Sequence, residues 1–228
     1  WVRDVYVGLD SADNYHIMVQ KQSIELEELS TYLHDFGQER PEQAWPYITP
    51  RFLIDKDIKM GVVRDVVTQS LAAGLHRIAY GVRVPGEYNA VYSCSYAFLK
   101  MYPGLHWPDF LFDREPEENL MNIRILGPKQ VQLNDTVVEV VDLAYVVYSR
   151  NHQQPELHID IDYSLDVPFE AYIATFTAIE SARTKMLNDV SIEQQGVPFD
   201  QLDPGTRRSV RREIRIKLRD LPFLQLRE

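Results

Sequence analysis

The residues whose types and spacing best suit chemistry are His158, Asp160 and Asp162, which alternate along one short segment. Alternate residues of a β-strand share one face, so these three side chains would point the same way. An imidazole with two carboxylates could hold Zn²⁺ or Mn²⁺. The alternative is that the apolar residues between them face the core while the polar residues face water. The similar segment Phe52–Asp57 has no histidine and no such triplet, so we predict no metal site.

Three aspartates follow short apolar segments, where a strand would pass into a helix: Asp55, Asp57 and Asp166. Such carboxylates could serve as general acids or bases. The other interpretation is that Asp57 or Asp166 caps the following helix by accepting a backbone N–H hydrogen bond. Because an aspartate stands at the same kind of junction twice, the sequence favours the cap.

Other catalytic signals are missing from the sequence. It contains no glycine-rich phosphate loop and no G-x-S-x-G nucleophile motif. Cys94, the single cysteine, has no neighbouring cue for a nucleophile, and we interpret it as a structural thiol on the apolar side of a short helix. We therefore expect a protein that is not an enzyme and that needs no cofactor.

Charge is spread unevenly along the 228 residues, whose net charge is −10. Residues 203–228 hold eight Arg or Lys against four acids, which makes this segment +4 and leaves −14 on the remainder. An acidic body argues against nucleic acid as a partner. The basic stripe Arg207, Arg208, Arg211, Arg212 and Arg215 could dock on anionic lipid or an acidic partner, or could be the solvated face of an amphipathic helix.

The elements that position these residues begin with a predicted hairpin of strands 5–9 and 16–19. A helix with Ser23 as N-cap and Gly37 at its end follows. The next predicted elements are a non-helical segment 38–51 with three prolines, a strand 52–54, a helix with an apolar stripe from Val62 to Leu71, Gly74 as the C′ residue, and a closing strand 76–84. Residues 85–120 form an aromatic-rich connector, with a short helix around Cys94. Its rings could stack on sugars or pack against a neighbouring unit.

A second unit repeats this order, since segments Gln20–Leu33 and Asn134–Val147 occupy matching places in the pattern. Strands at 122–126 and 130–133, a helix at 136–148, a strand at 157–162 and a helix at 169–188 are predicted. The sequence shows no closing strand. A last amphipathic helix, with Asp203 as N-cap and the apolar stripe Val210, Ile214, Leu218 and Leu221, is expected to end at Pro222. We predict an α+β fold of two small β-β-α-β-α units, residues 1–84 and 121–228, with helices on one face of a small mixed sheet and an extra C-terminal helix.

Three segments carry a resemblance to a known family: Ile24–Leu29, Phe52–Val63 and Ala72–Ala79. Together they resemble the periplasmic domain of the ExbD/TolR family. The second unit is similar to the Bacteroidetes-type ExbD variant, with a long second helix (166–188), the turn Gly196–Asp203 and an Arg-rich terminal helix. Residues 85–119 match no pattern of the family.

The resemblance implies a parent protein of the cell inner membrane, with one transmembrane helix before Trp1 and this segment in the periplasm. It implies an ExbB/TolQ-like channel subunit and a TonB/TolA-like protein as partners, in a complex that couples the protonmotive force to transport across the outer membrane. Peptidoglycan is a further candidate partner. Two copies in one chain depart from the usual family pattern, so we expect a pseudo-dimer within the chain or a homodimer.

The alternative is a stand-alone periplasmic glycan- or peptide-binding module with the same fold, because fold alone does not fix function. We expect a partner segment to bind by strand addition at an open sheet edge. The second unit lacks a predicted closing strand, so its edge is the favoured place. The expected partner-binding residues are Val131, Leu133, Ile159 and Ile161, joined by Arg208, Arg211, Arg212 and Arg215.

Overall fold

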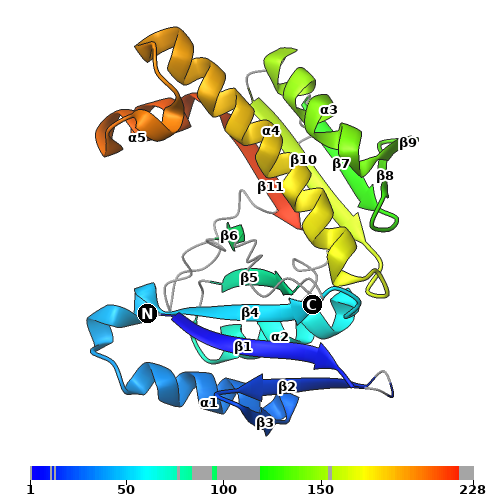
Figure 1. Ribbon diagram of the computed structural model, residues 1–228, viewed down its shortest axis with the longest axis vertical. Coiled ribbons are helices and arrows are strands. Elements are labelled where there is room, and N and C mark those ends of the chain that lie inside the picture. Colours follow the sequence, from blue (N-terminus) through cyan, green and yellow to red (C-terminus); the bar gives the residue numbers. More distant parts are fainter. Residues whose placement is uncertain are drawn as a thin grey trace. The chain divides into compact units, whose positions relative to one another are not determined.

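The computed structural model describes residues 2–10, 12, 14–75, 78–83, 94–96, 119–153 and 156–220. Within these residues the protein is α+β, as predicted, with five α-helices and two mixed sheets. The chain divides into two compact units: residues 1–113 with 168–170, and residues 114–167 with 171–228. Each unit contains one of the sheets (Figure 1).

The first sheet has six strands in the order β3-β2-β1-β4-β5-β6. They are β1 (Val2–Leu9), β2 (Tyr15–Val19), β3 (Gln22–Ile24), β4 (Thr49–Asp55), β5 (Ile78–Arg83) and β6 (Cys94–Tyr96). β1, β4 and β5 run parallel, whereas β2, β3 and β6 are each antiparallel to a neighbour. The predicted hairpin and both later strands are confirmed. The short helix predicted around Cys94 is wrong, because that residue begins β6.

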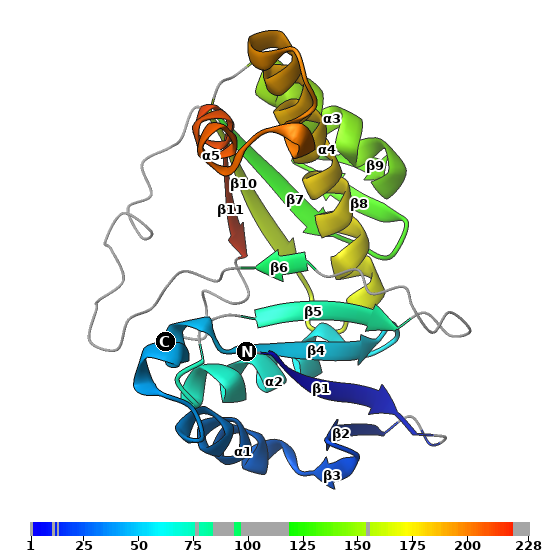
Figure 2. The ribbon, with the colours of Figure 1, turned by 60° about the vertical axis from the view of Figure 1, so that its left-hand side comes forward.

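The helices α1 (Leu26–Gln38) and α2 (Met60–Ala72) contact each other and cover one face of this sheet (Figure 2). Leu29, Leu33 and Phe36 are buried along α1, at the spacing of one helical face. Alternate residues of the strands are buried as well, among them Val5 of β1 and Ile54 of β4, which are fully buried. The first core therefore lies between the two helices and the sheet.

The ends of these helices differ from the prediction in two places. Ser23 lies in β3, and the N-cap of α1 is Glu25, which forms a reciprocal capping box with Glu28. Gly37 lies inside the last turn, where a Cβ atom would come within 3.0 Å of the Trp45 ring. Trp45 belongs to a 3-10 helix (Glu42–Tyr47), so the segment with three prolines is partly helical. Gly74 has φ +80° and follows the C-cap of α2, as predicted.

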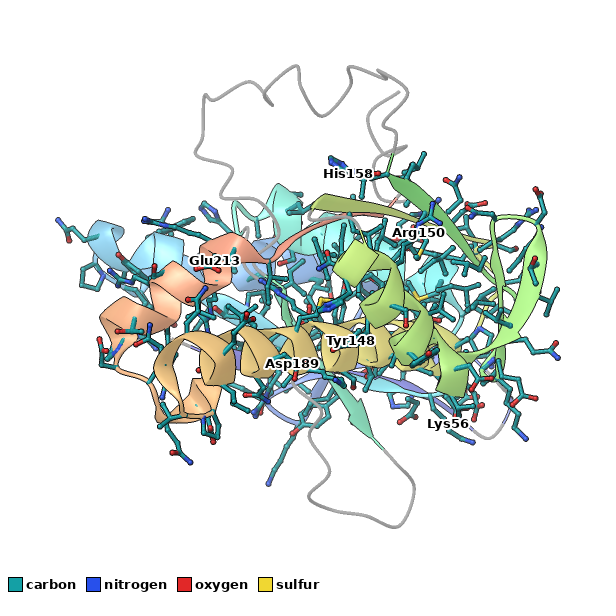
Figure 3. All side chains as sticks on the ribbon, turned by 90° about the horizontal axis from the view of Figure 1, so that it is seen from above. Lys56, Tyr148, Arg150, His158, Asp189 and Glu213 are labelled. Atoms are coloured by element: carbon teal, nitrogen blue, oxygen red, sulfur yellow. The ribbon has the colours of Figure 1, made fainter. Side chains whose placement is uncertain are left out.

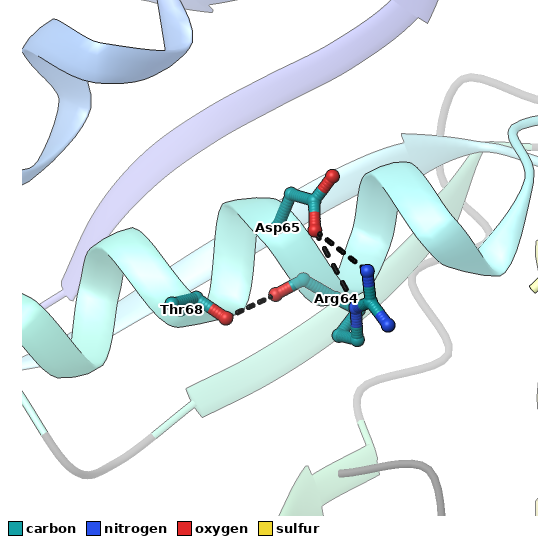
Figure 4. Close-up of polar contacts among 3 residues, drawn as sticks. All are labelled: Arg64, Asp65 and Thr68. Carbon is teal, nitrogen blue, oxygen red and sulfur yellow. Dashed lines mark hydrogen bonds and ion pairs between the residues drawn. The ribbon is translucent and has the colours of Figure 1, made fainter. Parts of the chain in front are cut away.

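The helix α2 carries local polar contacts among three half-buried residues (Figure 4). The Arg64 guanidinium lies 3.3 Å from the Asp65 carboxylate, and the Thr68 hydroxyl donates to the Arg64 carbonyl at 2.9 Å. Such a hydroxyl bond to the preceding turn is a usual way to place threonine within a helix. These contacts all lie within one helix, so they give no indication of a binding or catalytic site.

The second sheet has five strands in the order β11-β10-β7-β8-β9. They are β7 (Leu120–Ile125), β8 (Gln130–Leu133), β9 (Thr136–Glu139), β10 (Glu156–Tyr163) and β11 (Arg215–Asp220). β7, β10 and β11 run parallel, and β8 and β9 continue antiparallel. The helices α3 (Val140–Gln153) and α4 (Phe169–Gln195) lie over one face, and α5 (Pro204–Glu213) precedes β11.

Two predictions for this unit are wrong. Residues 136–139 are strand rather than helix, because the β-branched residues Thr136, Val137 and Val138 pair with β8. The terminal amphipathic helix ends at Glu213, and the chain then forms β11, which closes the sheet beside β10. Ile216 and Leu218 suited a strand as well as a helix, because a short apolar run does not separate the two.

Both sheets therefore share one connectivity, three antiparallel strands, a helix, a strand, a helix and a closing parallel strand. The tight turns match as well, since Gln20, Lys21 and Asn134 all have positive φ between the second and third strands of their sheets. The first sheet carries β6 in addition, and the second unit inserts α5 before its closing strand.

Candidate partner-binding surface

The predicted strand-addition edge lies inside the second sheet. β10 pairs with β7 on one side and β11 on the other. Ile159 and Ile161 are fully buried in the core. Their assignment as partner-binding residues is wrong, because the closing strand missed in the sequence occupies that edge.

The other two apolar residues of the prediction also lie in an interior strand. β8 stands between β7 and β9. Val131 is fully buried and Leu133 is half-buried, each opposite a residue of β7. Among the described strands, the edges of the second sheet are β9 and β11, and those of the first are β3 and β6.

The basic stripe is the part of the predicted site that stays on the surface. Its helix, α5, begins at Pro204. The N-cap is Asp203, whose carboxylate accepts hydrogen bonds from the backbone N–H groups of Gly205 and Thr206. Hydrogen bonds from Thr206 lower the pKa of Asp203. Val210 faces the core, and Arg208 lies on the opposite side of the helix because two residues turn it by about 200°.

Arg208, Arg211 and Arg212 are all exposed, and their spacing places them on one face of α5. Arg211 lies over the Phe199 ring, 5.3 Å from its centroid. Within the described part of the chain, Arg208 and Arg212 make no ion pair with a carboxylate. We call these three residues the arginine face. Arg215, the fourth predicted arginine, is the first residue of β11, and its side chain lies outside the described residues.

Neighbouring contacts hold α5 in place. The Arg207 guanidinium donates to the carbonyl of Asp200. The Gln194 side-chain amide near the end of α4 donates to the Glu213 carboxylate at 2.5 Å, and Glu213 is labelled in Figure 3. Glu213 is thus engaged away from the arginine face, which leaves that face positively charged.

The candidate metal triplet does not form a metal centre in the described residues, where no three His, Cys, Asp or Glu residues gather suitably. His158 and Asp162 are half-buried, and Asp162 lies 3.6 Å from Arg124 of β7. Asp160 is only 8% exposed, so the expectation that all three face water is wrong at this residue. In the strand register Asp160 stands between Asn122 of β7 and Arg219 of β11.

The predicted aspartate caps are also wrong. The N-cap of α2 is Lys59, without a side-chain cap, and α4 begins three residues after Asp166. The Asp55 carboxylate instead accepts the backbone N–H of Leu9 at 3.3 Å, which ties the end of β4 to the end of β1. The Asp55 carboxylate therefore stabilises the end of a strand.

Sequence reasoning missed a polar cluster between α3 and α4 (Figure 3). The Tyr148 hydroxyl donates to the Asp189 carboxylate at 2.6 Å, and the Lys185 ammonium lies 3.0 Å from the same carboxylate. The hydrogen bond from Tyr148 lowers the pKa of Asp189, and contacts with Tyr148 and then Asp189 raise the pKa of Lys185. The four-residue spacing of Lys185 and Asp189 was visible in the sequence, but their tyrosine comes from another helix.

In comparisons with known proteins, no protein-family model, no curated protein and no solved structure matches the chain. Within the described residues, no helix is both long enough and apolar enough to cross a membrane.

Proposed function

We propose that this chain is the periplasmic part of an ExbD/TolR-like subunit of a proton-driven, TonB/Tol-type complex. It would act by binding partners and transmitting their movement, not by catalysis. Its parent would be a single-pass protein of the cell inner membrane, working with an ExbB/TolQ-like channel subunit and a TonB/TolA-like protein.

The observation that carries this proposal is the repeated connectivity of the two sheets. Of the segments that resemble the family, residues 24–29 run from the end of β3 into α1, and residues 52–63 run from β4 into α2. The second unit follows the same order, with the closing strand that its sequence had hidden. A small sheet with both helices on one face leaves its other face and its edges for partners.

The arginine face is the surface we assign to an acidic segment of one of these partners. Arginine binds carboxylates in bidentate geometry, which adds specificity to charge. Attraction to an anionic membrane supplies about 1 kcal/mol for each basic residue, so three arginines give about 3 kcal/mol, too little for stable membrane binding. A protein segment with several carboxylates fits this surface better than a lipid headgroup layer does.

Strand addition remains part of the proposal, but at different strands. β9 and β3 are the described edges whose positions correspond in the two sheets, because each is the third antiparallel strand of its unit. Each is short, with four and three residues, so a partner strand would contribute few ladder hydrogen bonds. We therefore expect the arginine face to supply the specificity.

Co-purification of the full-length protein with an ExbB/TolQ-like subunit and a TonB/TolA-like periplasmic segment tests the function. We expect both partners to be retained, and we expect Arg208→Glu with Arg212→Glu to weaken retention of one partner in a salt-dependent way. Arg150→Glu, an equal charge change per site at an exposed residue of α3, is the matched control. Retention of neither partner by the unmodified protein, with firm binding to cell-wall sacculi instead, would favour the stand-alone module. Sedimentation of the same sample reports whether the chain forms a homodimer.

A further inference from the structure

The outward face of α3 carries two large apolar side chains in open contact with water. Val141 is 80% exposed and Tyr145 is 74% exposed. They are four residues apart, so they lie side by side on one face of the helix. The buried residues Leu143 and Val147 lie on the other side of the helix, against the core. We call Val141 and Tyr145 the α3 face.

The matching helix of the first unit shows that the fold does not require apolar residues there. α1 and α3 occupy the same place in the shared connectivity, and Leu29 with Leu33 matches Leu143 with Val147 in burial and spacing. In this alignment, the exposed residues Glu27 and Thr31 stand where the second unit has Val141 and Tyr145. The exposed face of α1 is therefore polar at the two positions where α3 is apolar.

Charges beside the α3 face restrict what can cover it. Glu139, the last residue of β9, and Asp142, in the first turn of α3, are both exposed. Lys129 is also exposed near the start of α3, since its backbone carbonyl accepts the Val140 N–H. Of the basic groups further along, Lys185 and His152 make contacts of their own, and Arg150 is turned away from Val141. Lys185 pairs with Asp189 and lies 3.8 Å from the centroid of the Tyr148 ring, on which His152 stacks. Arg150 is nine residues from Val141, which places it about 180° around the helix.

We propose that the α3 face is a docking site for a partner segment in which two neighbouring apolar side chains are flanked by Lys or Arg. The apolar pair would cover Val141 and Tyr145, and the flanking cations would meet Asp142 and Glu139. Tyrosine suits such a contact because it offers a rigid ring with a polar tip. A second copy of this chain fits poorly, because it would bring the same acidic residues against each other.

This inference does not rest on the proposed function, since either a motor subunit or a binding module could use the surface. The test titrates the whole chain into a labelled, end-blocked helical peptide with leucines four residues apart and lysines on both flanks. Fluorescence anisotropy gives the Kd. The variant Val141→Glu with Tyr145→Thr installs the residues of α1, and we expect it to weaken binding by about tenfold or more. A peptide with glutamate in place of lysine should bind at least about tenfold more weakly to the unmodified chain.

Ile192→Thr is the matched control, because Ile192 is a 53% exposed apolar residue of α4 outside the α3 face. It should leave the Kd unchanged. Circular dichroism checks that the double variant keeps its helices, as expected for changes at two exposed positions. Equal affinity of the double variant and the unmodified chain would overturn the proposal, as would absence of measurable peptide binding. Concentration-dependent dimerisation that the double variant abolishes would assign the α3 face to a second copy and overturn the proposed occupant.

Discussion

Each sheet joins its first strand to the next parallel strand through an ion pair, with the charges exchanged between the two units. In the first unit Asp4 of β1 faces Arg51 of β4, with hydrogen bonds of 2.7 and 2.8 Å from two guanidinium nitrogens. In the second unit Arg124 of β7 faces Asp162 of β10 at 3.6 Å. The first pair is about one-third exposed, and its hydrogen bond raises the pKa of Arg51. The Arg124 and Asp162 side chains are 63% and 46% exposed.

The two units share their connectivity but differ in the chemistry of their surfaces. Buried apolar positions repeat because both units must bury the same kind of sheet face under two helices. Exposed positions do not repeat, as the exchanged ion pairs and the contrast between α1 and α3 show. The second unit also adds α5 between its long helix and its closing strand, and that addition carries the arginine face. Binding properties are therefore expected where the units differ.

The largest expected effect comes from breaking the shared core at a strand the sequence assigned to an edge. Ile159→Pro removes a ladder donor and places a ring in an interior strand, so we expect a loss of about 3 kcal/mol or more. Chemical denaturation followed by circular dichroism measures it. Ile159→Val should cost only about 0.5 to 1.5 kcal/mol. Near-neutral behaviour of the proline variant would mean that β10 is an edge after all.

A smaller effect is expected where the two first helices differ in their last turn. Gly37 of α1 lies against Trp45, so Gly37→Ala should destabilise by about 1 to 2 kcal/mol even though alanine favours helix. The matching residue of α3 is Asn151, whose buried side-chain oxygen has no hydrogen-bond partner among the residues that the structure describes. Asn151→Ala should be neutral or stabilising by up to about 1 kcal/mol. Thermal unfolding of both variants measures the change in the free energy of unfolding that each substitution causes. Equal changes in the two variants would contradict the expected difference.

The exchanged ion pairs predict a difference in coupling energy. A double-mutant cycle on Asp4 and Arg51 should give about 1 kcal/mol, because the contact is bidentate and partly sheltered. The same cycle on Arg124 and Asp162 should give about 0.3 kcal/mol or less, since that pair is longer and more exposed. Raising the salt concentration should reduce the second value further. Equal coupling energies in the two cycles would show that distance and exposure do not set the difference.

The smallest effect concerns the cluster between α3 and α4, which has no counterpart among the described contacts of the first unit. Tyr148→Phe removes the hydrogen bond to Asp189 and should cost about 0.5 kcal/mol at neutral pH, after allowing for solvent screening. The folded state lowers the pKa of Asp189, so this stability is present above the unfolded pKa and disappears as pH falls through the folded pKa. Urea unfolding of both proteins from pH 7 to pH 2 should show the difference closing at acid pH. A difference that grows toward acid pH would contradict it.

Local patterns in the sequence were sufficient for most of the fold. Alternation identified β10, helical spacing identified α1 and α2, and the requirement for positive φ identified Gly74. The errors occurred where the local preferences for helix and for strand are nearly equal. Ile216 and Leu218 suit a strand as well as a helix, so only pairing with β10 decided their state.

The arginine face of the candidate site was predictable from the sequence, whereas the strand edge was not. The arginine face follows from the spacing of Arg208, Arg211 and Arg212 along α5, which a sequence displays directly. The strand edge depended on whether another strand pairs beside β10, and this is a long-range property. The same reason explains why the contact between Tyr148 and Asp189 could not be foreseen.

Local features of the sequence were enough to establish an α+β chain with a repeated order of elements, because hydrophobic periodicity and turn residues act locally. Tertiary structure was needed to show which strands are interior and which arginines stay exposed. It was also needed to show that Val141 and Tyr145 face water. Pairing and burial depend on residues far apart in the chain, and their free energies appear only once those residues meet.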